Sequence, residues 1–329
     1  MIPKKYEGYK IVDPHVHTWG EIEEVHFTKQ LKYLAVTSPK EVSLYAKKKG
    51  VDTVVVTDNS TIKYALQARE QAVSDIDVII GREFKVKSEG IESHVTVFPL
   101  TYESEKKIES LLAKKATIDE LVDCFNSENL IYILAHPFIP AKFNPSGGYD
   151  SDKKVRKDFL AKFMGLETIS GSMSLTFSPL TDQIATDLNL AKLGVSDAHY
   201  PDAIGNCHTL YQGDLYEAIR KKQTIAEGVG FSFSQSFNTV NSAFRANFQG
   251  LTNEDNPALN ELHSDKSKLL RKTAAALLPF GYVFSVVASP FVRVAHNTDV
   301  KVLKKAIDRN NGFSKHYEMP DELPKPLSQ

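Results

Sequence analysis

The stretch "YKIVDPHVHTWG" (residues 9–20) joins a short apolar run to two histidines, His15 and His17, separated by one residue. Alternate residues of a β-strand point to the same face, so a strand here would present both imidazoles on one side. Imidazole is a common metal ligand, but an isolated pair with this spacing is a weak signal. The pair indicates a metal site only if other parts of the chain supply further ligands.

Several other apolar runs contain, or end in, a residue that can bind a metal. Their nearly continuous Val, Ile and Leu content is typical of parallel strands that are buried on both faces. Helix-like stretches at residues 38–50, 60–74 and 117–129 lie between some of them, which predicts βα units and an α/β fold. The runs are "VDTVVVTDNS" (51–60), "SDIDVIIGREF" (74–84), "SHVTVFPL" (93–100), "LIYILAHPF" (130–138), "FMGLETIS" (163–170) and "AKLGVSDAH" (191–199).

Ionisable side chains gather toward the carboxyl ends of these runs, where the loops of an α/β barrel converge. A mixed nitrogen and oxygen ligand set suits zinc, manganese or iron better than calcium, which prefers oxygen alone. Burying so many ionisable groups together is costly unless metal ions or partners compensate, so the set predicts a shared metal centre. Its members are His15, His17, Asp58, Glu83, His94, His136, Asp197 and His199.

Two acidic residues are less specific. Asp58 taken alone is more typical of a helix cap, and Glu167 can equally be a half-buried surface acid. Both are therefore assigned to contacts with substrate or to the surroundings of the metals, rather than to the ligand set.

The order of these motifs resembles the PHP (polymerase and histidinol phosphatase) family of metal-dependent phosphoesterases. The resemblance implies a distorted (β/α)7 TIM-like barrel, catalytic, over residues 1–230 of the 329-residue chain. Residues 231–329 match no motif of the family, and a stripe of phenylalanines in 231–250 predicts a mainly helical C-terminal extension of unknown role. The matching motifs are "DPHVHT", "VTDN", "GREF", "SHVTVF", "LAHPFIP" and "GVSDAHYPDAIGN".

The resemblance also implies a binuclear metal centre, with a third metal in full members of the family. The family usually has a TDH motif where this chain has Asn59, and its HTxxSDG motif is absent from "HTWGEIEEVHF" (17–27). An amide oxygen is a poorer ligand than imidazole for zinc-like ions, so we expect two divalent ions (Zn, Mn or Fe) and a weak or empty third site. The resemblance implies three sets of ligands in this chain. The first ion would be bound by His15, His17, Glu83 and Asp197, and the second by Glu83, His94 and His136. The third site would be formed by His199 and Asn59.

The expected activity is hydrolysis of phosphate esters, by a phosphatase or phosphodiesterase in which metal-bound hydroxide attacks phosphorus. Asp197 and His199 are the expected catalytic residues, with His199 orienting the substrate or protonating the leaving oxygen. Two alternatives stay open. One is a non-catalytic PHP-fold scaffold or binding protein with an impaired third site. The other is an amidohydrolase-type C–N hydrolase, because those barrels also begin with an HxH pair.

Composition limits the classes of partner and the cellular compartment that we expect for this protein. A net charge of −1 gives no basic excess, which favours a small phosphate ester over nucleic acid, with a nucleic-acid end as the alternative. Two cysteines without a CxxC pattern and the lack of an apolar leader in "MIPKKYEGYK" fit a cytoplasmic setting. The uncharged stretch 273–292 is interpreted as a buried helix broken at prolines, with membrane contact as the alternative. The sequence gives no indication of an oligomeric state.

Overall fold

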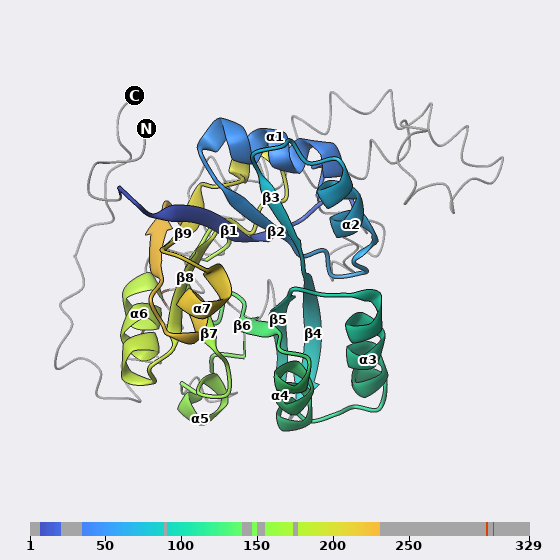
Figure 1. The fold of residues 1–329 in the computed structure, drawn as a ribbon. Helices are drawn as coiled ribbons and strands as arrows, with labels where there is room; N and C mark the ends of the chain where they lie inside the picture. The colour runs from blue at the N-terminus through green and yellow to red at the C-terminus, as the bar shows by residue number, and fades with distance from the viewer. Residues whose placement is uncertain are drawn as a thin grey trace, which may run out of the picture.

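The computed structural model describes residues 7–20, 35–88, 91–139, 147–149, 155–173 and 177–230, with the two isolated positions 301 and 305. These residues form an α/β fold with two five-stranded sheets (Figure 1). The expected helical extension over 231–329, including the stretch 273–292, lies outside the described residues apart from those two positions. Among the helices that are described, none is long and apolar enough to cross a membrane.

The first sheet has the strand order β10-β9-β1-β2-β3. Its strand β1 carries His15, runs parallel to β2, and is antiparallel to β9. β2 and β3 are parallel, and β10 is antiparallel to β9. The strands are β1 (Lys10–Val16), β2 (Thr53–Val56), β3 (Asp77–Ile80), β9 (Cys207–Tyr211) and β10 (Ile225–Gly228).

The second sheet has the order β4-β5-β6-β7-β8. β5 is antiparallel to both β4 and β6, whereas β6, β7 and β8 are parallel. The strands are β4 (Arg82–Ser88), β5 (Ile91–Phe98), β6 (Ile131–Leu134), β7 (Gly165–Ser170) and β8 (Ala191–Val195).

The expectation that all the apolar runs form parallel strands is therefore wrong for β4 and β5. The run 74–84 is also not one strand, because β3 ends before Gly81 and β4 begins after it. Along β4, Lys85 and Lys87 are exposed whereas Val86 is buried. This alternation is typical of an antiparallel hairpin with one face in water, and not of a parallel strand covered on both faces.

Helices connect and flank the sheets as the sequence predicts, with α1 and α2 near the first sheet and α3 and α4 near β4 and β5 (Figure 1). Ser38 and Glu41 form a capping box at the start of α1, and Gly50 ends that helix in a left-handed conformation. The helices are α1 (Pro39–Lys49), α2 (Lys63–Glu70), α3 (Tyr102–Ala113), α4 (Ile118–Ser127), α5 (Lys157–Leu160), α6 (Ser178–Asp187) and α7 (Leu215–Arg220), with a 3-10 turn at Pro201–Ala203.

The two sheets meet at the carboxyl ends of β1 and β2. Val16 forms a parallel bridge with Ala198, just beyond β8. On the other side, the backbone N–H of Glu83 donates to the carbonyl oxygen of Thr57 (2.9 Å). The strand ladders of the described residues still form two sheets and no closed barrel, so the expected (β/α)7 barrel is not confirmed.

Gly194 allows β8 to lie directly against β9 and β10 of the other sheet. Its N–H donates to the hydroxyl of Thr209 (3.0 Å), and the same hydroxyl donates to the carbonyl oxygen of Gly194 (2.8 Å). A Cβ at position 194 would lie 2.2 Å from the carbonyl oxygen of His208 and 2.7 Å from that of Glu227. Because both of these atoms belong to the backbone, they cannot move aside as the end of a flexible side chain could.

We predict that Gly194→Ala lowers the free energy of unfolding by about 3 kcal/mol, because the added methyl group forces the strands apart. The matched control is Gly213→Ala, where φ is 72° but no atom lies within 4 Å of the added Cβ. There only the left-handed strain of about 1 kcal/mol applies. Urea denaturation measures both variants, and an equal loss in the two would disprove the close-approach explanation.

Candidate metal centre

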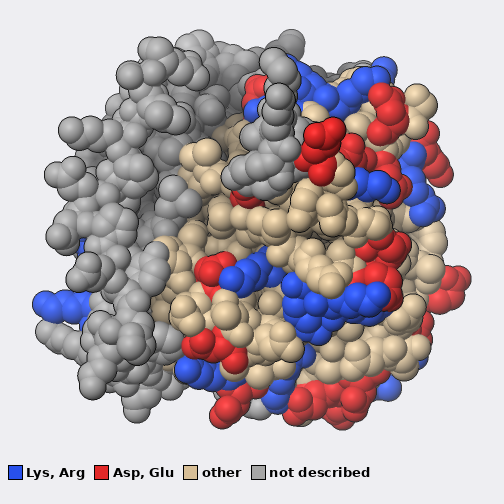
Figure 2. All heavy atoms as spheres, turned by 60° about the vertical axis from the view of Figure 1, so that its left-hand side comes forward, with Lys and Arg blue, Asp and Glu red and all other residues tan. Residues whose placement is uncertain are grey.

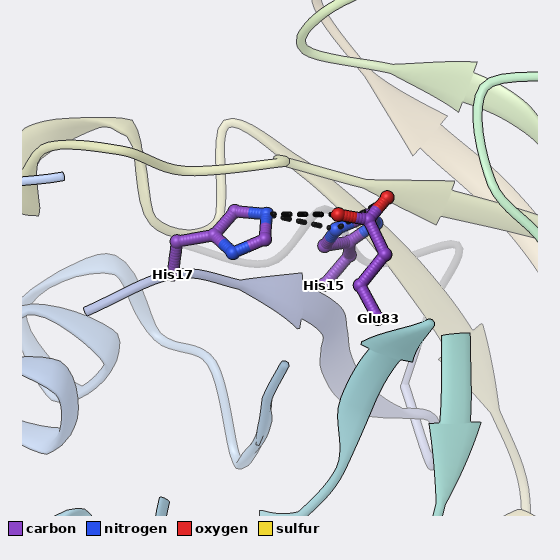
Figure 3. A group of neighbouring side chains, drawn as sticks. All are labelled: His15, His17 and Glu83. Carbon is purple, nitrogen blue, oxygen red and sulfur yellow. Dashed lines mark hydrogen bonds and ion pairs between the residues drawn. The ribbon is translucent and has the colours of Figure 1, made fainter. Parts of the chain in front are cut away.

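His15 and His17 lie at the end of β1 with their rings turned toward Glu83 of β4 (Figure 3). The Nε2 atoms of the two histidines are 3.0 Å apart. The Oε1 atom of Glu83 lies 3.7 Å from His15 Nε2, and its Oε2 atom lies 3.8 Å from His17 Nε2. All three side chains are buried, so one nitrogen from each ring and a carboxylate converge in the protein interior.

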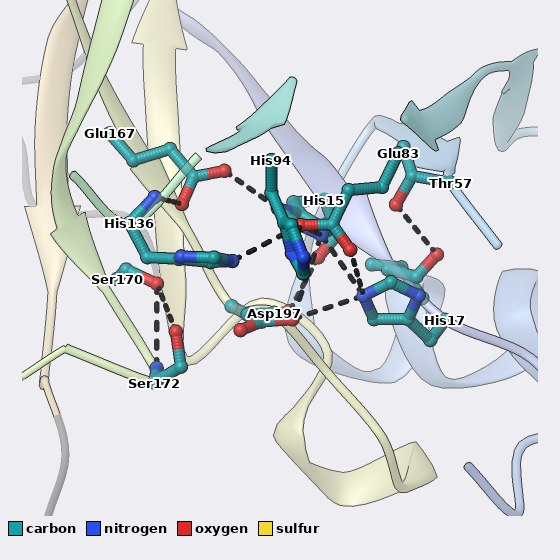
Figure 4. A network of polar contacts seen from close by, with 12 residues as sticks. His15, His17, Thr57, Glu83, His94, His136, Glu167, Ser170, Ser172 and Asp197 are labelled. Carbon is teal, nitrogen blue, oxygen red and sulfur yellow. Dashed lines mark hydrogen bonds and ion pairs between the residues drawn. The ribbon is translucent and has the colours of Figure 1, made fainter. Parts of the chain in front are cut away.

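A second pair of imidazoles contacts the same carboxylate from the other side (Figure 4). His94 of β5 lies with Nδ1 2.9 Å from Glu83 Oε1, and His136, which follows β6, lies with Nε2 3.1 Å from it. Two ligands bound to one ion at about 2.1 Å stand roughly 3 to 3.5 Å apart, so these atoms are spaced as ligands of a common cation. The other ring nitrogens, His94 Nε2 and His136 Nδ1, are buried and have no hydrogen-bond partner among the described residues.

Asp197 and His199 form a third group with His17. Asp197 Oδ1 lies 3.1 Å from His17 Nε2 and 3.6 Å from His15 Nε2. His199 stacks on His17 at a centroid distance of 4.5 Å, and its Nδ1 donates to the backbone oxygen of Asp197 (2.9 Å). The backbone oxygen of Asn59 accepts a hydrogen bond from Arg82 Nε (3.1 Å).

Glu167 lies behind the histidines and orients two of them. Its Oε1 accepts from His15 Nδ1 (2.6 Å), and its Oε2 accepts from the backbone N–H of His136 (2.7 Å). Because an ionised carboxylate can only accept, Nδ1 of His15 carries a proton, which leaves Nε2 as the nitrogen that faces Glu83 and could bind an ion. This carboxylate–histidine arrangement is common beside metal ions, where it fixes the ring and increases its basicity.

Asp58 is also buried, outside the ligand groups of the described residues, and its Oδ1 accepts from the backbone N–H of Thr18 (2.6 Å). It therefore holds the chain directly after the HxH pair. The helix-cap alternative is not supported, because the N-cap residue of α2 is Ile62 and no side chain caps that helix.

The electrostatics of the cluster favour a cation. Burial lowers the pKa of His15, but the carboxylates of Glu167, Asp197 and Glu83 outweigh it and hold that pKa well above its usual value. Burial likewise raises the pKa of Glu83 and of Asp197, but the neighbouring histidines hold both well below their usual values. The carboxylates thus keep their charge in the interior only while positive charge is close by. Divalent ions can supply that charge in place of protons.

Asp13 is a buried residue of this region to which the sequence assigned no role. Its Oδ1 accepts from the backbone N–H of Ser196 (3.0 Å) and its Oδ2 from that of Gly205 (2.8 Å). Burial raises the pKa of Asp13 to about 6. The signal that could have found it is an acid inside an apolar strand, two residues before the HxH pair.

We predict that metal affinity falls as the pH is lowered, starting above pH 6.5, the ordinary imidazole pKa. The pKa values of His15 and His136 are both raised, so protons compete with the metal at a higher pH than for free imidazole. The expected slope is about tenfold per pH unit for each proton released. Calorimetric titration of the metal-free protein between pH 6 and 8 measures it, and an affinity independent of pH there would contradict this ligand set.

We also predict that Glu167→Gln weakens metal binding about tenfold, because a neutral amide leaves His15 a less basic ligand. If the amide oxygen keeps the bond from His15 Nδ1, the NH₂ group faces the backbone N–H of His136, so we expect a loss of stability from that one bond with the fold retained. Calorimetry at a fixed pH, with circular dichroism as the folding control, tests this prediction. An unchanged metal affinity would show that Glu167 does not support the metal ligands.

Known proteins were compared with the chain at the level of sequence and of structure. The PHP-associated family model matches residues 180–224, from α6 to the end of the loop after α7. No curated protein is significantly similar to the chain in sequence.

Among solved structures, one similar chain is a two-domain protein from Bacteroides vulgatus that contains a predicted PHP-like metal-dependent phosphoesterase. It is 15% identical, with 67% of this chain and 65% of that chain covered and a TM-score of 0.49. This chain thus spans slightly less than two thirds of that protein. PsfC from Pseudomonas syringae is 17% identical, with 68% and 92% covered and a TM-score of 0.45. An amidohydrolase from Chromobacterium violaceum with bound sulfate is 14% identical, with 65% and 97% covered and a TM-score of 0.43.

At these TM-scores and identities, none of the activities in these names carries over to this chain. The PHP-associated match falls on the segment that contains Asp197 and His199, in a chain that carries the other PHP motifs in order. It confirms, over that segment, the resemblance to the PHP family seen in the sequence.

Proposed function

We propose that this protein is a metal-dependent hydrolase of phosphate esters with a binuclear centre. The observation that carries the proposal is the position of Glu83, whose carboxylate belongs both to the group with His15 and His17 and to the group with His94 and His136. A carboxylate shared by two sets of ligands is suited to holding two ions close together. Such a pair can clamp both the attacking and the leaving oxygen of a phosphoryl group.

The ligand types fit divalent transition metals. Imidazole with carboxylate suits zinc, manganese and iron alike, so the choice among these three is left to the metal titration. When bound, the ions would neutralise charge on the phosphoryl oxygens and make water a stronger nucleophile. The chain itself would contribute the ligand geometry, with Glu167 orienting His15 and Asp58 holding the backbone at Thr18.

His199 is the residue we assign to the substrate. Its side chain is 17% exposed, whereas that of His17 is 1% exposed, so His199 is the more accessible ring of the stacked pair. Because its Nδ1 donates to a backbone carbonyl, Nε2 is the nitrogen left to meet a substrate oxygen or an ion. Protonated, it would supply the proton for the leaving oxygen. An ion in the third group would bind weakly, since it would share His17 and Asp197 with the first ion.

A small phosphate ester is the substrate class that fits best. On the described part of the face in Figure 2, basic side chains form one short group with acidic side chains around it, which is less than the broad basic field that a nucleic-acid backbone requires. A monoester or diester could be accepted, and the end of a nucleic-acid strand is the alternative to test. We also infer that the two sheets are parts of one distorted barrel, which the Val16–Ala198 bridge supports.

We predict that the full-length protein releases phosphate or alcohol from a panel of nitrophenyl monoesters and diesters. Turnover should require added Mn²⁺ or Zn²⁺ and cease with EDTA. Asp197→Asn should lower both the bound metal and kcat/KM, the latter by at least about a hundredfold, because a charged ligand is lost. The control is Asp202→Asn on the same loop, whose side chain is 69% exposed, and which should behave as wild type.

Other results would redirect the assignment. Metal binding without hydrolysis of any ester would favour the scaffold, and hydrolysis of amides or lactones in preference to esters would favour a C–N hydrolase. Full turnover with a normal metal content in Asp197→Asn would contradict the proposed centre.

A further inference from the structure

One buried carboxylate holds both ends of the loop that carries Asp197 and His199. Asp13, on β1, accepts from the backbone N–H of Ser196 at the start of this loop and from that of Gly205 at its end. The hydroxyl of Ser196 donates to the backbone oxygen of His15 (3.4 Å), a longer contact between the start of the loop and β1. The Asp13 side chain is 0% exposed, so its bonds are made where water cannot replace them.

The loop 196–205 needs such restraint. Asp197 has a φ of 48°, a left-handed conformation that a residue other than glycine adopts at a cost of about 1 kcal/mol or more. Strain of this kind persists only when the surroundings enforce it. The middle of the loop is held at two further points, where Ala198 accepts from the backbone of His17 and His199 accepts from that of Val36. Asp13 is the side chain that bonds both ends.

We propose that Asp13 is a positioning residue, which fixes the loop 196–205 at both ends and thereby holds Asp197 and His199 against His17. The inference rests on the proposed function, because it assumes that Asp197 and His199 face metal or substrate there. The inference also predicts that a change at Asp13 affects the two metal sites differently. The group of Glu83, His94 and His136 comes from β4, β5 and the chain after β6, so its geometry should not depend on the loop.

Asparagine is the informative replacement at position 13. Two backbone N–H groups face the two carboxylate oxygens, and an amide offers only one acceptor oxygen. The NH₂ group would then face an N–H donor, and one end of the loop would be released. The shape of the side chain is otherwise kept, so packing of β1 should change little.

The chain offers a matched control in Asp52. Its Oδ2 accepts from the backbone N–H of Ile11 (2.7 Å), which lies on β1 as Asp13 does. Asp52→Asn thus weakens a carboxylate–backbone bond to the same strand without touching the loop 196–205. Ser196→Ala is a milder second variant, which removes the hydroxyl that ties the start of the loop to the backbone oxygen of His15 and keeps both bonds to Asp13.

The experiment is a titration of the metal-free full chain with ¹¹³Cd²⁺, followed by NMR so that each site gives its own resonance. Asp197→Asn and His94→Gln assign the resonances. Asp13→Asn should weaken the site containing Asp197 at least about tenfold, a loss typical of a residue that supports a ligand, and leave the site containing His94 within about twofold. Asp52→Asn should change neither site. Ser196→Ala loosens the same end of the loop and should weaken the Asp197 site alone, by less, so it shows whether that site depends on restraint of the loop if Asp13→Asn does not fold.

In the double variant Asp13→Asn with Asp197→Asn, the asparagine at position 13 should cause no further loss, because it acts through Asp197. Equal weakening of both sites in Asp13→Asn, or an unchanged Asp197 site in both Asp13→Asn and Ser196→Ala, would overturn the inference. Selective weakening in a protein that hydrolyses no ester would leave the inference standing while the proposed function fails. A wild-type chain that binds no cadmium would overturn both.

Discussion

The contact of Glu83 with four imidazoles is the constraint on which the rest of this structure depends. A carboxylate in the protein interior loses its hydration and is stable only if positive charge or hydrogen-bond donors surround it. Here His94 and His136 lie within 3.1 Å of one of its oxygens, and His15 and His17 lie within 3.8 Å of the carboxylate. Protons on these rings can stabilise the group, and divalent ions can do so while also binding a phosphoryl group. The same arrangement therefore explains both the burial of Glu83 and the proposed chemistry.

The fold brings the two sheets together around this cluster. β1 supplies the HxH pair, β4 and β5 supply Glu83 and His94, and the bridge between Val16 and Ala198 places the loop after β8 beside them. A second layer of carboxylates then fixes the ligands, with Glu167 behind His15 and His136, and Asp13 behind the loop of Asp197. The two sheets and the ends of their strands supply the buried ligands, and the more exposed ring of His199 lies on the loop.

The sequence was sufficient to predict the residues of the cluster but not the way they are held. The HxH spacing and the order of the later motifs identified the residues that the structure brings together, while their binding of metal stays a prediction. The break at Gly81 and the antiparallel pairing of β4 with β5 were missed, because strand direction depends on pairing partners that local apolar content does not specify. The hydrogen-bonding roles of Glu167 and Asp13 could not be predicted from the sequence for a related reason. Their partners, His15 and Ser196, are 152 and 183 residues away in the chain.

The most direct test of the central claim is anomalous X-ray scattering from crystals of the full chain grown with Mn²⁺ or Zn²⁺, recorded on both sides of the metal absorption edge. The account predicts one peak bound by Glu83, His94 and His136, and a second bound by His15, His17 and Asp197, with Glu83 between them. Crystals that show no anomalous density at Glu83, with metal bound elsewhere or not at all, would contradict it.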